Sequence, residues 1–586
     1  MQRGIPVILL LLLSAAASAA DPVAEFNATS GISVSGWTPE RDKEKPAEIA
    51  FEDGVLRIED FEQDGKAEDG YFRFDLTDAQ RATARLDGFV YEWTVRIPEN
   101  TGGVTRAIST EVCVKAATPE SLLRFGLSLG RRGSELVGGL YTGKDSGWQE
   151  GARIVTDPDE FHTWTLVFDG QSRVFNLLVD GHLALAAEME HRDTGHDLVF
   201  GSRSTGTGIS EWKSVRFSLG IGDTKLVTPA PLPDRNDVFT GGQDGYFAYR
   251  IPSLIVAPNG DLLVFCEARK ANLSDDGDID LLLKRSTDNG QTWSDQHLIY
   301  EEGGDAHIKY GNPTAVVDSQ TATIWLAANR DYLTDRGQRA GGTLVFFRST
   351  DNGHTWSAPI DITESIKRPD WGHYAFGPGI GIQVQRGPHR GRLVIPANYR
   401  LSFNKREPSY SHIIYSDDHG ETWKLGGQLG DYTNECQVVE IVDGDRSGLL
   451  FNVRNHWGRG GFPDKSGSRL VARSFDGGTT WTDEKMDPAL PEPPCQASIY
   501  RYSFPAKDEP GYILFANPAG RGRSNLRVRL SLDEGLTWPV SKLLARGSAA
   551  YSCMARLPDG RVGIVFERNN YKQISFATFS LDWLMQ

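Results

Sequence analysis

The chain has few cysteines, no excess of positive charge and no zinc-binding spacing. Its 586 residues include five cysteines, none of them in a Cys-x-x-Cys or Cys/His pattern typical of a structural zinc site. We therefore expect buried free thiols, with one disulfide of unassigned pairing as the alternative, and no metal or cofactor. Lysine and arginine total 62 against 78 aspartates and glutamates, a net charge of −16. This balance argues against nucleic acid as a partner.

The chain also lacks a long apolar segment after its first twenty residues. Arg3 precedes the apolar run 5–13 and the small residues 15–20, which is the order of a secretory signal peptide. No later run approaches the roughly 18 apolar residues that a membrane-spanning helix requires. The sequence predicts cleavage near Ala19 or Ala20 and a secreted, periplasmic or cell-surface protein without membrane insertion.

A pattern of eight residues, Ser-x-Asp-x-Gly-x-Thr-Trp, occurs five times after short β-type runs. The copies begin at Ser286, Ser349, Ser416, Ser474 and Ser531. The Asp and Ser side chains can bond turn amides and Gly takes positive φ, so each copy predicts a hairpin turn. Copies 57 to 67 residues apart indicate a repeat architecture. We call these segments the boxes and expect them to be structural.

Aligned on the boxes, each unit has two further strands upstream. The units begin near residues 250, 313, 379, 436, 497 and 551, and the sixth ends in an incomplete box at 579–583. Six four-stranded units predict an all-β, six-bladed β-propeller over residues 237–586. The boxes then lie at the hairpins between third and fourth strands. The starts of first strands and the ends of second strands converge on the opposite face, where we expect the chemistry.

Residues 21–225 lack the boxes and have a different sequence pattern. Alternating runs such as 88–97 and 161–168 read as strands, and no stretch reads as a helix, so we predict a β-sandwich of jelly-roll type. Residues 226–236 form a proline-containing linker. The segment 164–181 resembles the laminin-G and concanavalin-like lectin domains. This resemblance implies a carbohydrate-binding role, and a purely structural appendage is the alternative.

The predicted chemical face gathers polar residues that core packing does not explain. Arginines, carboxylates and a tyrosine occur at the starts of first strands and at the ends of second strands, and nearby loops add further polar residues. The set is Arg250, Glu267, Arg269, Asp275, Asp276, Asn312, Glu435, Arg454, Arg521, Arg523, Tyr551 and Glu567. Arginines from three separate units on one face indicate an anion site, and a planar guanidinium suits a carboxylate best.

These motifs, in this order, resemble the bacterial exo-α-sialidases (neuraminidases) of the Asp-box propeller family over the whole repeat region. The resemblance implies that Arg250, Arg454 and Arg523 bind the carboxylate of sialic acid, with Arg521 as the alternative third arginine. It implies that Glu567 holds Arg250 in position. It also implies that Arg269 lines the pocket.

The resemblance further implies Tyr551 as the nucleophile, Glu435 as its base, and Asp275 as the general acid/base with Asp276 as the alternative. A neutral tyrosine suits a sugar that carries a carboxylate on its anomeric carbon, because an anionic nucleophile would be repelled. The implied activity is the retaining hydrolysis of terminal α-linked sialic acids from glycoconjugates. Transfer through the same intermediate and a non-catalytic glycan-binding propeller are the alternatives. Asn312 stands where some members have aspartate, which leaves the preferred sialic acid open.

Overall fold

The computed structural model describes most of the chain. The described residues are 22, 24–28, 37–41, 48–60, 69–100, 108–114, 123–132, 135–141, 148–152, 159–171, 174–188, 198–203, 208–221, 226, 232–302, 308–334, 339–444, 446–482, 484–506, 509–519 and 522–585. The predicted signal peptide lies outside them. The chain divides into two compact units, Met1–Pro231 and Leu232–Gln586. Strands dominate both units, which confirms the predicted all-β class.

The first unit is a sandwich of two antiparallel sheets. One has the order β13-β12-β11-β6-β15-β4-β3 with β1 added beside β15, and the other has the order β10-β9-β8-β7-β14-β5-β2. The bounds of the first sheet are β1 Ala24–Asn27, β3 Glu48–Glu52, β4 Val55–Asp60, β6 Phe89–Asn100, β11 His162–Phe168, β12 Val174–Val179, β13 His182–Glu188 and β15 Gly208–Leu219. Those of the second are β2 Thr38–Arg41, β5 Asp69–Phe74, β7 Ile108–Val114, β8 Leu123–Arg132, β9 Glu135–Tyr141, β10 Trp148–Ala152 and β14 Leu198–Arg203.

Aromatic side chains hold the two sheets of the sandwich together. The rings of Phe26 on β1 and Phe200 on β14 lie 5.2 Å apart between centroids, and Trp93, Trp164 and Trp212 are fully buried in the same core. Large aromatic rings bury much apolar surface each, so a few of them suffice to join two sheets.

The expectation that residues 21–225 contain no helix is wrong. Helix α1 spans Asp78–Leu86 and starts with a capping box, in which Gln80 N donates to Thr77 Oγ1 at 3.3 Å and Thr77 N donates to Gln80 Oε1 at 2.8 Å. The pattern Thr-x-x-Gln is a helix-start signal, and it could have revealed this helix in the sequence.

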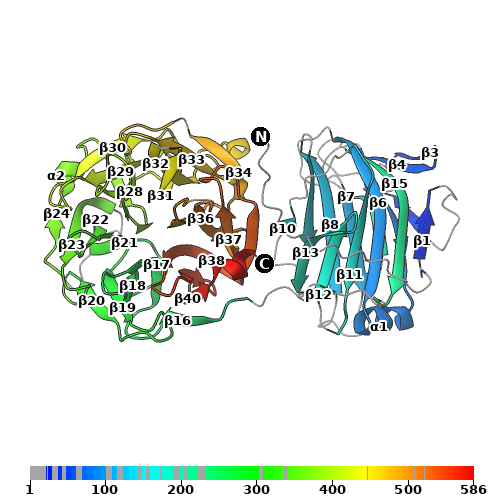
Figure 1. Ribbon diagram of the computed structural model, residues 1–586, viewed down its shortest axis with the longest axis horizontal. Helices are drawn as coiled ribbons and strands as arrows, with labels where there is room; N and C mark the ends of the chain where they lie inside the picture. Colours follow the sequence, from blue (N-terminus) through cyan, green and yellow to red (C-terminus); the bar gives the residue numbers. More distant parts are fainter. Residues whose placement is uncertain are drawn as a thin grey trace. The chain divides into compact units, whose positions relative to one another are not determined.

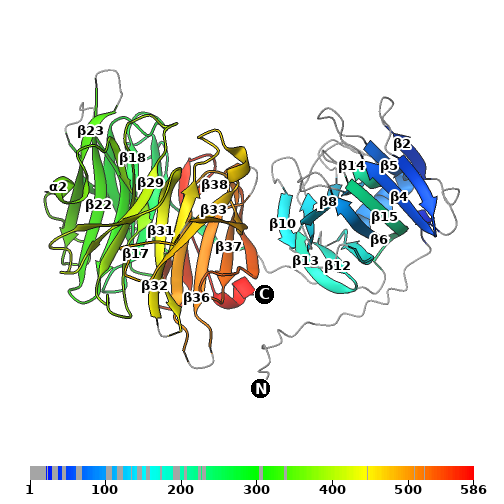
Figure 2. The ribbon, with the colours of Figure 1, turned by 90° about the horizontal axis from the view of Figure 1, so that it is seen from above.

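The second unit contains four hydrogen-bonded sheets, some of which join neighbouring blades, and its strands lie around a common centre like the blades of a propeller (Figure 1). The strands run side by side between its two faces (Figure 2). In chain order they are β16 Arg235–Thr240, β17 Ala248–Val256, β18 Leu262–Arg269, β19 Ile279–Ser286, β20 His297–Tyr300, β21 Ile308–Asp318, β22 Thr323–Leu333, β23 Arg339–Ser349, β24 Ile360–Asp361, β25 His373–Phe376, β26 Gly379–Ile380, β27 Ile382–Gln383, β28 Leu393–Arg400, β29 Tyr410–Ser416, β30 Lys424–Gln428, β31 Thr433–Asp443, β32 Arg446–Asn455, β33 Ser468–Ser474, β34 Lys485–Pro491, β35 Ser498–Ser503, β36 Tyr512–Pro518, β37 Ser524–Ser531, β38 Val540–Arg556, β39 Val562–Arg568 and β40 Gln573–Phe579. Short helices are α2 Thr363–Ile366, the 3-10 turn Pro463–Lys465 and α3 Leu581–Met585.

Two strands join the last blades to the rest of the ring. The long β38 pairs with β37 through its first half and with β39 through its second half, so it serves two blades. Strand β16, before the first blade, pairs with β40 and supplies the outer strand of the last blade. Strand β38 also contacts β17 of the first blade. Helix α3 follows β40, in the segment where the sequence has the incomplete sixth box.

Each box closes a hairpin through its own side chains. In the first copy, Ser286 Oγ accepts from Gly290 N at 2.8 Å and donates to Asp288 Oδ1 at 2.7 Å, and Thr292 N donates to the same Oδ1 at 2.9 Å. Gly290 has φ +86°, and a Cβ there would lie 2.0 Å from Phe576 Cε1. The Ser–Asp and Gly–Ser bonds recur in the other four copies. The repeated Ser, Asp and Gly residues of the boxes thus bond within their own turns.

Four cysteines, Cys266, Cys436, Cys495 and Cys553, are free and buried, as predicted. The side chain of Cys113 lies outside the described part. No described helix is long and apolar enough to cross a membrane.

Candidate active site

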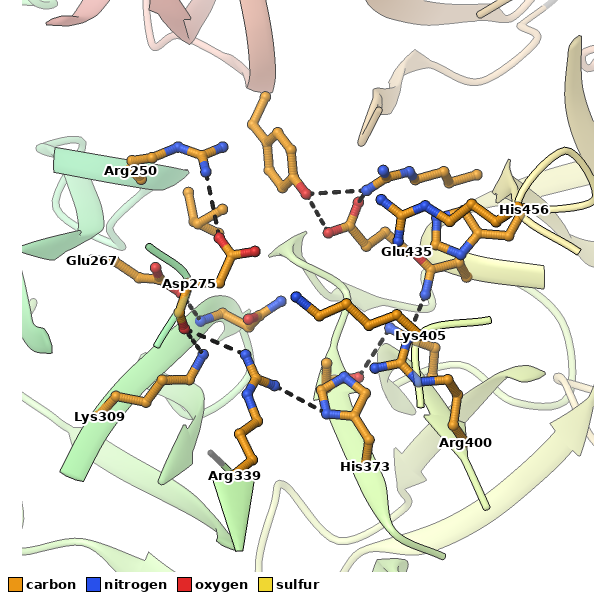
Figure 3. Close-up of a pocket in the computed structure, with 18 of the residues that line it drawn as sticks. Arg250, Glu267, Asp275, Lys309, Arg339, His373, Arg400, Lys405, Glu435 and His456 are labelled. Atoms are coloured by element: carbon orange, nitrogen blue, oxygen red, sulfur yellow. Dashed lines mark hydrogen bonds and ion pairs between the residues drawn. The ribbon is translucent and has the colours of Figure 1, made fainter. Parts of the chain in front are cut away.

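One polar pocket of the second unit brings the predicted site residues together (Figure 3). Its lining includes nine of the polar residues named from the sequence: Arg250, Glu267, Arg269, Asp275, Asn312, Glu435, Arg454, Arg523 and Tyr551. Glu567 lies behind Arg250 and bonds to it, Asp276 turns away to bond Arg339, and Arg521 lies outside the described residues. No box residue lines the pocket, although every box is described.

Bulges at the starts of first strands direct these side chains into the pocket. The ladder of β17 slips between Arg250 and Ser253, and that of β21 slips between Gly311 and Thr314. Equivalent slips occur in β31 between Thr433 and Cys436 and in β38 between Ala549 and Ser552. A bulge bends its strand and re-aims a side chain. The same irregularity in four blades therefore presents Arg250, Asn312, Glu435 and Tyr551 to the pocket.

The bulges of β17 and β21 hold residues in the left-handed region. Ile251 has φ 57° and Asn312 has φ 54°, and each precedes a proline. A β-branched residue at positive φ is strained, and such strain persists only where the surroundings enforce it. Here a glutamate accepts each strained amide: Ile251 N donates to Glu567 Oε1 at 2.8 Å, and Asn312 N donates to Glu267 Oε1 at 2.9 Å.

Glu567 and Glu267 thus have equivalent positions in successive blades. Each lies near the end of a second strand, is buried, and binds an arginine as well as the next blade's bulge. Glu567 accepts from Arg250 Nε and Nη2, both at 3.0 Å, and from Tyr551 N at 3.3 Å. Glu267 accepts from Arg269 Nε at 3.1 Å and Nη2 at 2.6 Å. The sequence analysis placed Glu267 on the chemical face but assigned it no role.

Tyr551 and Glu435 form a bonded pair at the centre of the site. The phenol of Tyr551 donates to Glu435 Oε1, and Arg454 Nη1 contacts both groups, at 2.5 Å from Glu435 Oε2 and 3.2 Å from the phenol oxygen. Burial raises the pKa of Tyr551 well above its usual value and Glu435 raises it further, whereas Arg454 and Arg523 lower it. The phenol is therefore neutral and has a carboxylate ready to accept its proton.

Three guanidiniums surround the Tyr551 side chain. The Cζ atoms of Arg250 and Arg523 lie 5.3 and 5.4 Å from the centroid of its ring, and Arg454 bonds its oxygen. Arg250 is held by Glu567 and Arg454 by Glu435, while Arg523 donates to Tyr571 Oη at 3.2 Å. Three arginines fixed around one point provide an anion site with several N–H donors.

Asp275 reaches the pocket from the loop after β18, with about half of its side chain exposed. Its Oδ1 lies 3.2 Å from Arg269 Nη2 and 3.5 Å from Arg250 Nη1. Burial by itself raises the pKa of Asp275, but Arg269, Arg250 and Lys309 outweigh burial and hold the pKa well below its usual value. Asp275 is therefore a carboxylate.

The pocket also contains polar residues that the sequence reasoning missed. They lie on the second, third and fourth blades: Lys309, Arg339, His373, Asn398, Arg400, Lys405, Asn434, His456 and Arg459. Arg400 ends a second strand, as Arg269 does, so the same position in the repeat could have flagged it. Lys405 and Arg459 lie in loops, where no sequence pattern indicates that they line the pocket.

The fold and this pocket together define an Asp-box propeller with an anion-binding site. A family model described as "BNR repeat-like domain" matches residues 260–564. A sialidase of Micromonospora viridifaciens is 36% identical over 374 residues, which are 60% of this chain and 55% of that protein. Sialidase-2 of Cricetulus griseus is 31% identical over 368 residues, 58% of this chain and 94% of that protein.

The solved structure of Hadza microbial sialidase Hz136 is similar with a TM-score of 0.54 and 26% identity, over 88% of this chain and 96% of that chain. The chain belongs to the sialidases of the BNR repeat-like family. Its match spans about half the length of the Micromonospora relative.

Proposed function

We propose that the protein is an exo-α-sialidase that hydrolyses terminal α-linked sialic acids from glycoconjugates with retention of configuration. The observation that carries this proposal is the bonded pair Tyr551–Glu435 inside a cluster of three arginines. An anion site alone would serve a binding module. A buried phenol bonded to a carboxylate adds the nucleophile and base that a covalent glycosidase needs.

In the first step, Arg250, Arg454 and Arg523 bind the substrate carboxylate and place the anomeric carbon near Tyr551. Glu435 takes the phenol proton as the tyrosine oxygen attacks, and Arg454 stabilises the negative charge that develops on both groups. Because Tyr551 is neutral until it reacts, it approaches a carboxylate-bearing carbon without charge repulsion.

Asp275 protonates the leaving oxygen and then activates water against the tyrosyl–sugar bond. Its pKa is depressed by Arg269 and Arg250. A bound substrate carboxylate partly neutralises Arg250, so binding of substrate raises the pKa of Asp275 toward the value that an acid requires. Two displacements on one carbon give net retention.

The test is Tyr551→Phe, which removes the nucleophilic oxygen and leaves the arginines in place. We expect kcat for an aryl α-sialoside to fall at least about 10³-fold while a sialic acid ligand still binds. Near-normal turnover by this variant would refute the mechanism. Lactose in the wild-type assay measures how much sialic acid is transferred to a sugar instead of water.

Two further parts of the proposal concern the start of the chain. The signal-like residues 1–20 support export to the cell surface, periplasm or medium. The lectin-like segment 164–181 supports carbohydrate binding by the sandwich unit.

A further inference from the structure

Three cations of the pocket have no part in the mechanism proposed above. Arg400, Lys405 and Arg459 line it, and within the described part of the chain none of their side chains has a hydrogen-bond or ion-pair partner. Arg400 Nε is buried without an acceptor. These residues come from the end of β28, the loop after it and the loop after β32. We call them the second cationic cluster.

Neighbouring cations on the same side of the pocket are paired with carboxylates, unlike those of the second cationic cluster. Arg339 Nε bonds Asp276 Oδ1 at 2.5 Å, and its Nη1 lies 3.4 Å from Asp331 Oδ2. Lys309 Nζ lies 3.6 Å from the same Asp331 oxygen. Across the whole pocket, nine lining residues are arginine or lysine and three carry a carboxylate. Among the described residues, the second cationic cluster and Arg523, which donates to Tyr571 Oη, are the lining cations without a bonded carboxylate.

Arg400 contributes most to the argument because it is buried. Only 6% of the residue is exposed, and burial together with Arg339 and Arg459 outweighs the attraction of Glu407 and Glu435 and lowers its pKa to about 10. Figure 3 shows Arg339, His373 and Arg400 across the pocket from Arg250 and Glu435, with the side chain of Lys405 extending over the middle. A buried cation whose burial is not offset by nearby carboxylates destabilises a fold, and a ligand that supplies an anion removes this cost.

The pocket also offers little surface for an apolar substituent. Ile251 and Ala375 are the two aliphatic residues among the twenty that line it. An acyl methyl group near the cluster would remove water from charged groups without replacing their hydrogen bonds, which is unfavourable. A charged oxygen group at the same place satisfies the guanidinium and ammonium donors.

We propose that Arg400, Lys405 and Arg459 bind a second anionic group of the substrate, separate from the carboxylate that Arg250, Arg454 and Arg523 bind. The substrate class is an α-glycoside of a 2-keto sugar acid that presents two negative charges to the pocket. The second charge has two sources: a carboxylate on the sugar that is released, or the carboxylate of the next sugar in an acidic chain. This inference rests on the proposed function and specifies its substrate.

The experiment compares three substrates of the full-length protein. The first is an aryl α-sialoside with an intact side chain. The second is the same glycoside with the side chain shortened by periodate and oxidised to a carboxylate, and the third is an α2,8-linked disialoside. We expect kcat/KM for the second or the third to exceed that for the first at least about tenfold, because hydrogen bonds between two charged partners are the strong ones. Whichever is preferred identifies the source of the second charge.

Variants of the cluster assign the preference to its residues. Arg400→Gln and Lys405→Gln should each reduce the preference about tenfold, whereas Arg406→Gln, an exposed neighbour that does not line the pocket, should leave it unchanged. Equal kcat/KM for all three substrates in the wild type overturns the inference. So does a preference that survives both cluster variants.

Binding measured without turnover separates this inference from the proposed activity. Titration calorimetry of the free sugar acid and of its oxidised diacid should show tighter binding of the diacid, lost in Arg400→Gln. If no substrate is hydrolysed but this difference appears, the proposed activity is wrong and the second cationic cluster stands. If the aryl sialoside is hydrolysed and neither the oxidised diacid nor the disialoside is preferred or bound more tightly, the cluster is wrong and the activity stands.

Discussion

Replacing Glu567 by glutamine tests whether one buried carboxylate organises the site. Glu567 is fully buried and accepts four hydrogen bonds, two from Arg250 and one each from the amides of Ile251 and Tyr551. Glutamine keeps the shape, loses the charge and turns an NH2 group toward these donors. Arg250, with 7% of its surface exposed, then loses its principal counter-ion.

The cost of this change follows from the burial of Arg250. Removing one partner of a buried ion pair costs about 3–5 kcal/mol. Asp275, 3.5 Å from Arg250 Nη1, compensates part of the charge, so we expect the lower end, about 3 kcal/mol. At roughly 2–4 °C per kcal/mol, the propeller transition should move down by about 6–12 °C. We also expect kcat/KM for an aryl sialoside to fall about 10²-fold, because both Arg250 and the backbone of Tyr551 lose their support.

Calorimetry and steady-state kinetics on Glu567→Gln measure both effects. Glu440→Gln is the matched control, since Glu440 is a buried glutamate that accepts from the amides of Gln385 and Arg386 at 2.7 and 2.9 Å. Burial raises the pKa of Glu440, so losing its charge should cost little. If Glu567→Gln is no less stable than Glu440→Gln, the role assigned to Glu567 is refuted.

Three further outcomes are expected. Arg400→Met should stabilise the protein by about 1–3 kcal/mol in denaturant unfolding, because it removes a buried cation whose pKa the fold lowers to about 10, and a loss of stability would contradict this reasoning. Burial is the largest single effect on Asp351 and raises its pKa, but the hydrogen bonds from Thr355, Ser349 and His354 together outweigh burial and lower the pKa from 3.8 to about 2. Because the pKa of Asp351 is lower in the folded than in the unfolded state, the ionised carboxylate stabilises the fold above about pH 4, and this stabilisation is lost as the pH falls toward about 2. Asp351→Asn should therefore weaken the dependence of unfolding on acid pH. An unaltered pH profile of stability would contradict this. Deleting residues 21–225 should spare turnover of a small aryl sialoside and weaken action on polymeric glycans, whereas equal loss on both would make the sandwich structural.

The repeat was predictable because its information is local. A box bonds its own serine, aspartate, glycine and threonine within eight residues, so the pattern survives in the sequence unchanged from blade to blade. Helix α1 also had a local signal in Thr77 and Gln80, which the alternating runs around it obscured.

Other features depend on residues far apart in the chain. Strand β16 pairs with β40 more than 330 residues later, and no property of Arg235–Thr240 indicates that partner. The slips in the first strands arise where a glutamate of the preceding blade accepts the amide of Ile251 or Asn312. Such bonds cross between blades, so a pattern within one blade does not reveal them.

The sequence by itself indicated the number of repeat units, the face on which we propose that the chemistry lies and the residues proposed to react, because turn bonds and strand ends recur at a regular interval. Tertiary structure alone decided that Asp275 lines the pocket while Asp276 bonds Arg339. It also left Arg400, Lys405 and Arg459 without a hydrogen-bonded or ion-paired carboxylate among the described residues. The physical reason is that charge balance is a property of side chains brought together by folding. The sequence does not show whether a lysine or arginine is paired with a carboxylate of the protein or is available to bind a ligand.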